Sequence, residues 1–421
     1  MGKFPNLTLF AGLALFTITA AAAQETGQNS GPTMLAPFAT PENIEQRRLD
    51  EFDETLERAM ATGDFVGLAV AVVRRGDIVF LKTYGETEID SGAAVTPNTL
   101  FRIASLSKGF ASSMVGLAVS DGVLSLDAPA TDYAPELALS GGAEKSLTLA
   151  YLLSHRTGLP PNAYDNLLEA GIAPKAILPQ FSKVKPICPV GQCYAYQNIT
   201  YDIAGRAVAS VYGAPFDELV ATRLFTPLGM VTASYGQDAL LASGDWARPH
   251  NRRRQRDRNL PQHPWKVMDV KQPYYATPAA GGVNASILDM AQWLKAQIGD
   301  APEVLSPSVL NLIHQPRVNT PSESRRMRSV MANLRSSQYA LGWRVYDYAG
   351  TRVIAHGGSV DGYGAQIAFI PETGDGIVVL SNTRTRRLWS IAPMFLDLTL
   401  GHPEKDWLAL EDSGFTAAGS Q

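Results

Sequence analysis

A serine and a lysine three residues apart carry the clearest chemical potential in this chain. Ser105 and Lys108 lie where a strand-like run gives way to a helical pattern, and at helical spacing their side chains share a face. A serine hydroxyl needs an adjacent base to attack a carbonyl, and a partly desolvated lysine one turn away is such a base. If Ser105 opens the helix, the free N–H groups there also help to stabilise an oxyanion. The alternative is that Ser105 only caps the helix and that Lys108 is solvated.

A second Ser-x-x-Lys pattern runs from Ser182 to Lys185. It lies in a stretch that contains Pro179, Pro186 and Pro189, where no helix would hold the spacing. We interpret this copy as a solvated loop.

Two segments offer partners for Ser105. Tyr196 and Asn198 place a phenol and an amide on one short segment, and the 164–166 segment repeats the pattern beside two prolines. A loop bounded by Cys188 and Cys193 leads into Tyr196, and an apolar helix follows it. We therefore favour Tyr196 and interpret Tyr164 as a surface residue of a loop.

The third element with chemical potential is the run His356, Gly357, Gly358 and Ser359, at the end of a β-rich stretch. Glycines allow a substrate backbone to approach the edge of a sheet closely. A single histidine is usually structural, but the paired glycines favour a position in a cleft for His356.

The elements that must position these residues are strands near both chain ends and helices between them. Periodicity and turn residues predict this pattern, which implies one sheet built from both termini with a helical insertion beside it. The expected helices are 41–61, 147–153, 199–211, 216–224, 287–297 and 388–400, and the expected strands are 67–74, 77–84, 339–346, 351–355, 363–370 and 376–380.

Composition describes an ordinary globular protein. The chain has 421 residues, 45% of them hydrophobic, and a formal net charge of −4, so nothing overall suggests nucleic-acid binding. The one strongly basic run, from Arg252 to Arg258, has no interleaved aromatic residues, and we expect it to be a solvated loop.

The N-terminus predicts export. Lys3 precedes an apolar run from Leu7 to Ile18 and an Ala-x-Ala site at 21–23, so residues 1–23 read as a signal peptide, followed by a linker over 24–40. In an oxidising periplasmic or extracellular space, Cys188 and Cys193 can pair. Their bridge closes too small a loop to stabilise the whole fold much, and we expect it to hold the backbone before Tyr196.

The three motifs, in this order, resemble those of the serine β-lactamase and penicillin-binding protein superfamily. The resemblance is greatest to its class C β-lactamase-related branch, which includes D-Ala-D-Ala carboxypeptidases, D-aminopeptidases and esterases. It implies an α/β/α fold with a mostly antiparallel sheet, in a single catalytic domain over 41–400 followed by a tail over 401–421. The α/β part would be 41–126 and 335–400, and the helical subdomain 127–334. Supporting stretches are 152–159, 224–230, 280–283 and 339–343.

The resemblance also implies roles for the site residues. Ser105 would be acylated, Lys108 and Tyr196 would manage its proton and activate the deacylating water, and Asn198 would orient the substrate amide. The backbone N–H groups of Ser105 and Ser359 would form the oxyanion hole.

His356 departs from the pattern, since class C β-lactamases resemble one another in having lysine there. A histidine that is mostly neutral near pH 7 attracts a substrate carboxylate weakly and in a pH-dependent way. We therefore expect short esters and D-amino-acid peptides or amides as substrates. The alternatives are a β-lactamase or D-Ala-D-Ala carboxypeptidase proper, and a weakly catalytic penicillin-binding or sensor protein.

Other hydrolase classes fit less well. No serine lies in a Gly-x-Ser-x-Gly motif, as an α/β-hydrolase would require. The six histidines are scattered without a His-x-x-x-His pattern, so we expect no metal and no cofactor. The expected partner is a small-molecule or peptide substrate, for which a cell-wall origin is one possibility.

Overall fold

The computed structural model describes residues 41–253, 255, 262–403 and 405–411. Residues Gln46–Gln421 form one compact unit, and Met1–Glu45 is assigned to a separate one. The predicted signal peptide, the linker over 24–40 and the end of the tail lie outside the described residues. None of the described helices is long and apolar enough to cross a membrane.

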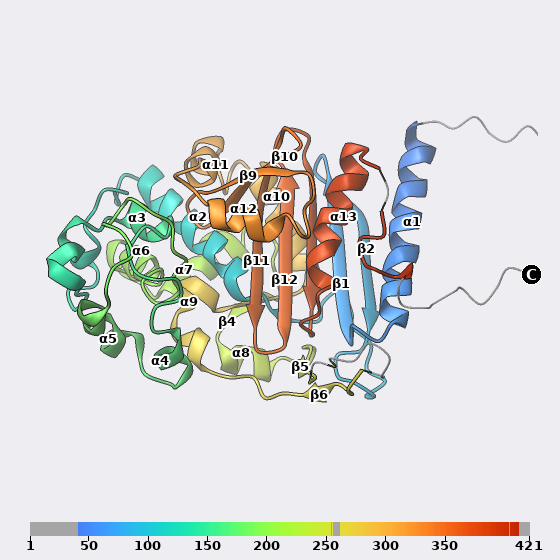
Figure 1. Ribbon diagram of the computed structural model, residues 1–421, viewed down its shortest axis with the longest axis horizontal. Coiled ribbons are helices and arrows are strands. Elements are labelled where there is room, and N and C mark those ends of the chain that lie inside the picture. Colours follow the sequence, from blue (N-terminus) through green and yellow to red (C-terminus); the bar gives the residue numbers. More distant parts are fainter. Residues whose placement is uncertain (1–40, 254, 256–261, 404, 412–421) are drawn as a thin grey trace, which may run out of the picture. The chain divides into compact units, whose positions relative to one another are not determined.

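An eight-stranded antiparallel sheet is the centre of the fold, with strands from both ends of the chain side by side (Figure 1). This confirms the expected mostly antiparallel sheet. In sheet order the strands are β2 (Asp77–Gly85), β1 (Gly67–Arg74), β13 (Asp375–Ser381), β12 (Tyr363–Ile370), β11 (Thr351–Val360), β10 (Arg344–Tyr348), β9 (Leu334–Tyr339) and β8 (Val318–Asn319). The short strands β3 (Phe101–Arg102), β7 (Val283–Ala285) and β4 (Ser234–Tyr235) form a second sheet, and β5 (His250–Asn251) pairs with β6 (Lys266–Val267).

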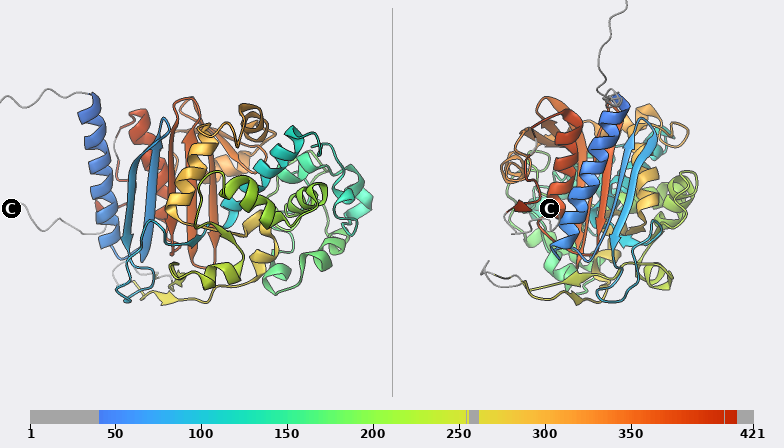
Figure 2. Two further views of the ribbon diagram at one scale, coloured as in Figure 1. Left: turned by 180° about the vertical axis from the view of Figure 1, so that it is seen from behind. Right: turned by 90° about the vertical axis from the view of Figure 1, so that its right-hand side faces the viewer.

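Both faces of the large sheet are covered by helices (Figure 2). The continuous apolar run of β1 reflects this, because Ala69 and Ala71 belong to one hydrophobic core and Leu68 and Val70 to the other. The second core also contains residues of α1 (Pro41–Ala61) and α13 (Leu388–Leu400), and the first contains residues of α2 (Ser107–Ser120) and α10 (Ile287–Ile298).

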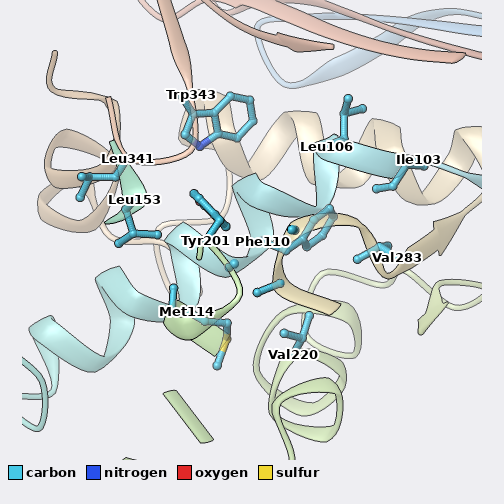
Figure 3. Close-up of a cluster of buried hydrophobic side chains, with 14 of the residues drawn as sticks. Ile103, Leu106, Phe110, Met114, Leu153, Tyr201, Val220, Val283, Leu341 and Trp343 are labelled. Atoms are coloured by element: carbon cyan, nitrogen blue, oxygen red, sulfur yellow. The ribbon is translucent and has the colours of Figure 1, made fainter. Parts of the chain in front are cut away.

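The middle of the chain is mainly helical and packs around α2. Phe110 and Met114 of α2 lie in the same buried cluster as Tyr201, Val220 and Trp343 (Figure 3). The helices here are α3 (Leu149–Leu153), α4 (Asp165–Glu169), α5 (Pro174–Ile177), α6 (Ile203–Tyr212), α7 (Phe216–Val220), α8 (Gln237–Ala242), α9 (Pro278–Gly281), α11 (Pro307–His314) and α12 (Pro321–Met327). A π-helical turn over Ala221–Phe225 continues α7, and 3₁₀ turns include η1 (Ala104–Leu106) and η4 (Leu178–Lys183).

Three predictions of secondary structure, two for strands and one for a helix, need correction. The single strand expected over 339–346 is two strands, β9 and β10, joined by a turn in which Gly342 has φ +77°. The strand expected to end at residue 355 continues to Val360 as β11, so the run from His356 to Ser359 lies inside a strand. The helix expected from residue 199 begins at Ile203, which leaves Tyr196 and Asn198 on a longer loop.

Candidate active site

Ser105 lies in a tight 3₁₀ turn directly before α2. The turn is η1, and it is preceded by Ile103 and begins at Ala104, which has φ +50°, a left-handed conformation that non-glycine residues adopt at a cost. Ser105 thus stands at the start of a helical segment, as expected, half-buried at the wall of a cavity.

Lys108 is fully buried beneath Ser105. Its Nζ lies 3.3 Å from Ser105 Oγ, and it donates hydrogen bonds to Asn198 Oδ1 at 2.8 Å and to the Ala280 carbonyl at 2.9 Å. Burial lowers the pKa of Lys108 from its ordinary 10.5 to about 7, although the charge of Asp165 raises it. A substantial fraction of the amine is therefore neutral at neutral pH, as a base requires.

The loop before α6 brings Tyr196 to the same point. The Lys108 Nζ lies 4.8 Å from the centroid of the Tyr196 ring. Burial raises the pKa of the Tyr196 phenol, and a hydrogen bond with Ser105 opposes the rise. Tyr196 therefore keeps its proton at neutral pH unless a base accepts it.

His155 fixes the backbone on both sides of Tyr196. The N–H of Ala195 donates to the His155 carbonyl at 2.8 Å, and the N–H of Gln197 donates to His155 Nδ1 at 3.1 Å. His155 is fully buried and has φ +57°. In the sequence His155 stands out only as part of the 152–159 stretch, which implies no role for it.

Asn198 is held at both ends of its amide. Its Oδ1 accepts from Lys108, and its Nδ2 donates to Asp165 Oδ2 at 2.7 Å. Asp165 belongs to the 164–166 segment that we had set aside, and it lines the cavity with Ser105. Burial raises the pKa of Asp165, and the Asn198 hydrogen bond opposes this rise.

His356 sits in a chain of buried hydrogen bonds. Because Gln197 donates to His155 Nδ1, the proton of His155 is on Nε2, which faces the Tyr339 hydroxyl at 3.1 Å. Tyr339 in turn lies 2.9 Å from His356 Nε2, and His356 Nδ1 lies 2.9 Å from the Gly357 carbonyl. This order of donors leaves His356 neutral, with its proton on Nδ1.

His356 lines a second cavity that adjoins the one with Ser105, but its imidazole is almost fully enclosed. Its side chain is 4% exposed, and both ring nitrogens already have protein partners. Burial lowers the pKa of His356 well below its ordinary value. The expected pH-dependent charge near the substrate is therefore not supplied by this imidazole.

The two glycines also make close contacts with protein atoms. A Cβ at Gly358 would lie 2.2 Å from the Ile103 carbonyl, and one at Gly357 would lie 3.0 Å from the Trp389 ring. The glycines thus allow close packing against the turn of Ser105 and against α13. Beyond Ala355, β11 pairs with β12 but no longer with β10, so its other edge, with exposed Ser359, borders the cavity.

The cavity that contains Ser105 measures about 750 Å³. One wall carries Asp165 and Glu169, and another carries Glu323, Arg326 and Arg344. Glu323 Oε1 lies 2.6 Å from Arg326 Nη2 and 2.9 Å from Arg344 Nη1. The Arg344 guanidinium lies 5.9 Å from the Tyr196 ring centroid. No sequence motif marks Arg344, although it directly follows the 339–343 stretch.

The predicted disulfide between Cys188 and Cys193 is present. Within its loop, the Gly191 carbonyl accepts from Arg156 Nε at 2.8 Å, and the Gly191 N–H donates to the Arg156 carbonyl at 2.8 Å. Since Arg156 follows His155, the bridge braces the segment that fixes Tyr196.

The candidates set aside lie elsewhere. Ser182 is exposed in the 3₁₀ turn η4, which ends at Lys183 before reaching Lys185. Tyr164 is half-buried and stacks on Phe181 with ring centroids 5.5 Å apart.

The basic run is described only in part. Arg252 binds the Asp64 carboxylate, and its guanidinium lies 4.3 Å from the centroid of the Trp265 ring. Its contacts are therefore outside the cavity that contains Ser105. Residue 254 and residues 256–258 lie outside the described residues. In the part of the chain that the structure describes, no group of three or more His, Cys, Asp or Glu side chains is placed to hold a metal ion.

Comparisons with known proteins identify the family of this chain. The Beta-lactamase family model matches residues 52–399. An unguisins hydrolase of Aspergillus campestris is 26% identical over 79% of this chain and 61% of its own length, and a beta-lactamase of Pseudomonas fluorescens is 24% identical over 78% and 92%. This chain thus spans about three fifths of the first relative.

The fold comparison points the same way. The octameric penicillin-binding protein homologue from Pyrococcus abyssi superposes with a TM-score of 0.73, at 23% identity, over 86% of this chain and 79% of that one. The chain belongs to the Beta-lactamase family, within the superfamily of serine β-lactamases and penicillin-binding proteins.

Proposed function

We propose that this chain is an exported serine hydrolase that cleaves ester or amide bonds through an acyl-enzyme on Ser105. The observation that carries the proposal is the buried Lys108 amine, 3.3 Å from Ser105 Oγ with a pKa lowered to about 7. Relatives named hydrolase and beta-lactamase support the same class of reaction. The amide of Asn198 and the Ala280 carbonyl hold the amine in place.

Acylation follows from this arrangement. Ser105 Oγ attacks the substrate carbonyl while its proton passes to Lys108, directly or through the Tyr196 phenol. The backbone N–H groups of Ser105 and Ser359 stabilise the oxyanion. The leaving atom then departs with a proton from the same pair, and a water activated by that pair hydrolyses the acyl-enzyme.

Short esters and D-amino-acid peptides or amides remain the proposed substrates. The Asn198 amide has two hydrogens, and one of them is donated to Asp165. The other is available to a substrate carbonyl. Asp165 and Glu169 give one wall of the cavity a negative charge suited to a substrate ammonium group.

A second candidate is a D-Ala-D-Ala carboxypeptidase or β-lactamase. Arg344 favours it, because a guanidinium that lines the cavity near Tyr196 supplies the charge for a substrate carboxylate that His356 does not. Glu323 partly neutralises Arg344, so the attraction is moderate.

Three measurements test the proposal. A fluorophosphonate probe should label the mature protein at Ser105, as located by mass spectrometry, and the Ser105→Ala variant should not react. Labelling of Ser182, or none with several acyl probes, would refute the site. Comparing kcat/KM for p-nitrophenyl acetate, a D-alanyl peptide and nitrocefin ranks the substrates, and a preference of about a hundredfold for nitrocefin would favour the second candidate. Export is checked by N-terminal sequencing, which should begin at Gln24.

A further inference from the structure

A second cavity of about 500 Å³ adjoins the one that holds Ser105, on the α13 face of the sheet. In Figure 1, α12 and α13 lie on the same side of β11 and β12, and the cavity is lined by residues from all four elements. The space exists because the strands beneath it carry small residues, since Ala355 pairs with Ala368 and Gly357 follows two positions later. Its apolar walls include Met327, Val330, Trp389 and Leu396.

The two cavities share part of their lining. Glu323, Arg326, Arg344, Gly357 and Ser359 border both of them. A substrate bound along the edge of β11 at Ser359 can therefore extend a group past Arg344 into the second cavity.

The charge of this second cavity is strongly positive. Arg384 and Arg386 are exposed at its lining, and neither side chain has an ion pair or hydrogen bond with any described residue. Glu323 is the one carboxylate among the described lining residues, and it is already shared by Arg326 and Arg344. An apolar floor beneath unpaired guanidinium groups is complementary to an apolar group that carries a carboxylate.

The position of Tyr196 indicates which part of the substrate enters. The leaving atom takes its proton from Tyr196 or Lys108, so the leaving group must lie on the Tyr196 side of the scissile bond. Arg344 flanks Tyr196 at 5.9 Å and also borders the second cavity. We propose that this cavity binds the leaving group, and that the preferred leaving groups are aromatic or branched apolar groups bearing a carboxylate. The assignment rests on the proposed function.

Direct binding tests the cavity without requiring turnover. The probe is 2-naphthoate, titrated into the mature protein by calorimetry, with 2-naphthamide as the neutral counterpart. We expect naphthoate to bind about tenfold tighter than the amide, and the Arg384→Gln/Arg386→Gln double variant to lose most of that difference. Val330→Trp should weaken the binding of both probes, because the larger side chain occupies part of the cavity.

The matched control is Arg325→Gln, an exposed arginine of α12 that lies outside the lining. It should bind both probes like the parent protein, and melting curves should show that every variant is folded. Equal affinities for naphthoate and naphthamide, or the same loss in the control and the double variant, would overturn the proposal.

Turnover then separates this proposal from the proposed function. The paired esters are 6-acetoxy-2-naphthoate and 2-naphthyl acetate, which differ in the carboxylate. The parent protein should favour the charged ester by about tenfold in kcat/KM, and the double variant should bring the ratio near one. Hydrolysis that needs Ser105 but shows no preference refutes the subsite alone. Arginine-dependent binding of naphthoate without hydrolysis refutes the proposed function alone.

Discussion

Gly358 of β11 packs directly on the carbonyl of Ile103, two residues before Ser105. A Cβ at position 358 would lie 2.2 Å from that oxygen and 3.1 Å from Leu106 Cδ1. Ala104, between Ile103 and Ser105, has φ +50°. The run from His356 to Ser359 therefore shapes the turn that presents Ser105.

Gly358→Ala should therefore disable the enzyme. The added methyl group must push the Ser105 turn away from β11, and a displacement of about 1 Å in an active site can cost about a hundredfold in rate. We expect kcat/KM for p-nitrophenyl acetate to fall by roughly that factor. Gly244→Ala is the matched control, because a Cβ there meets nothing within 4 Å. Normal activity in Gly358→Ala would contradict the packing argument.

The pH profile should report the Lys108 amine. Because burial lowers the pKa of Lys108 to about 7, the neutral amine that accepts the Ser105 proton is scarce below that pH and predominates above it. We expect kcat/KM for a neutral ester to rise with pH and to level off above about pH 8. A flat profile between about pH 5 and pH 8 would show that this amine is not the base.

The same group predicts a pH-dependent cost in stability. A folded pKa of about 7 against 10.5 in the unfolded chain corresponds to roughly 5 kcal/mol. The unfolded state binds more protons between these values, so the cost is full below about pH 7 and disappears as the pH rises to about 10.5. Lys108→Met removes this term, although it leaves Asn198 and Ala280 without their donor.

Denaturant titrations of both proteins check this prediction. The free energy of unfolding of Lys108→Met, relative to the parent, should decrease by several kcal/mol from about pH 6 to about pH 10. A difference independent of pH would mean that the folded-state pKa of Lys108 is close to its ordinary value.

Much of the sheet could be predicted from sequence because its strands are strongly apolar. β1 and β12 are buried along nearly their whole length, and the apolar runs gave their bounds. The prediction of one strand over 339–346 is wrong, because Gly342 introduces a turn where a Cβ would lie 2.5 Å from the Tyr201 hydroxyl and 2.7 Å from the Lys108 carbonyl. Such a contact between distant segments leaves no periodic signal.

The residues of the site also divide into those that the sequence could assign and those that it could not. Ser105 and Lys108 could be paired from their spacing, since both belong to one helical segment. His155, Asp165 and Arg344 could not be assigned, because each acts on a residue more than 25 positions away or on a cavity wall that only the fold creates. Asp165 even lies in the 164–166 segment, for which the neighbouring prolines predict a surface loop.

The disulfide should matter more for activity than for stability. Cys188 and Cys193 are five positions apart, and closing so short a loop contributes about 2 kcal/mol. The loop nevertheless holds Arg156, beside the His155 that fixes Tyr196. In the Cys188→Ser/Cys193→Ser variant we expect a small shift in Tm and a clear loss of kcat. A large drop in Tm with unchanged kinetics would reverse this assignment.

The charge that selects the substrate should reside on Arg344. His356 is buried and neutral, with both ring nitrogens bound to protein atoms, whereas the Arg344 guanidinium lines the Ser105 cavity. In Arg344→Gln, the kcat/KM ratio of a D-alanyl-D-alanine peptide to its C-terminal amide should fall by about tenfold or more, because a charge-assisted hydrogen bond is worth roughly 1.5–3 kcal/mol.

His356→Lys should instead lower stability, because it places an ammonium in the hydrogen-bonded chain with Tyr339. Arg335→Gln, which alters an exposed arginine of β9, is the control and should leave the ratio as it is. If the peptide-to-amide kcat/KM ratio is unchanged in Arg344→Gln and rises in a folded His356→Lys protein, position 356 rather than Arg344 determines the charge preference.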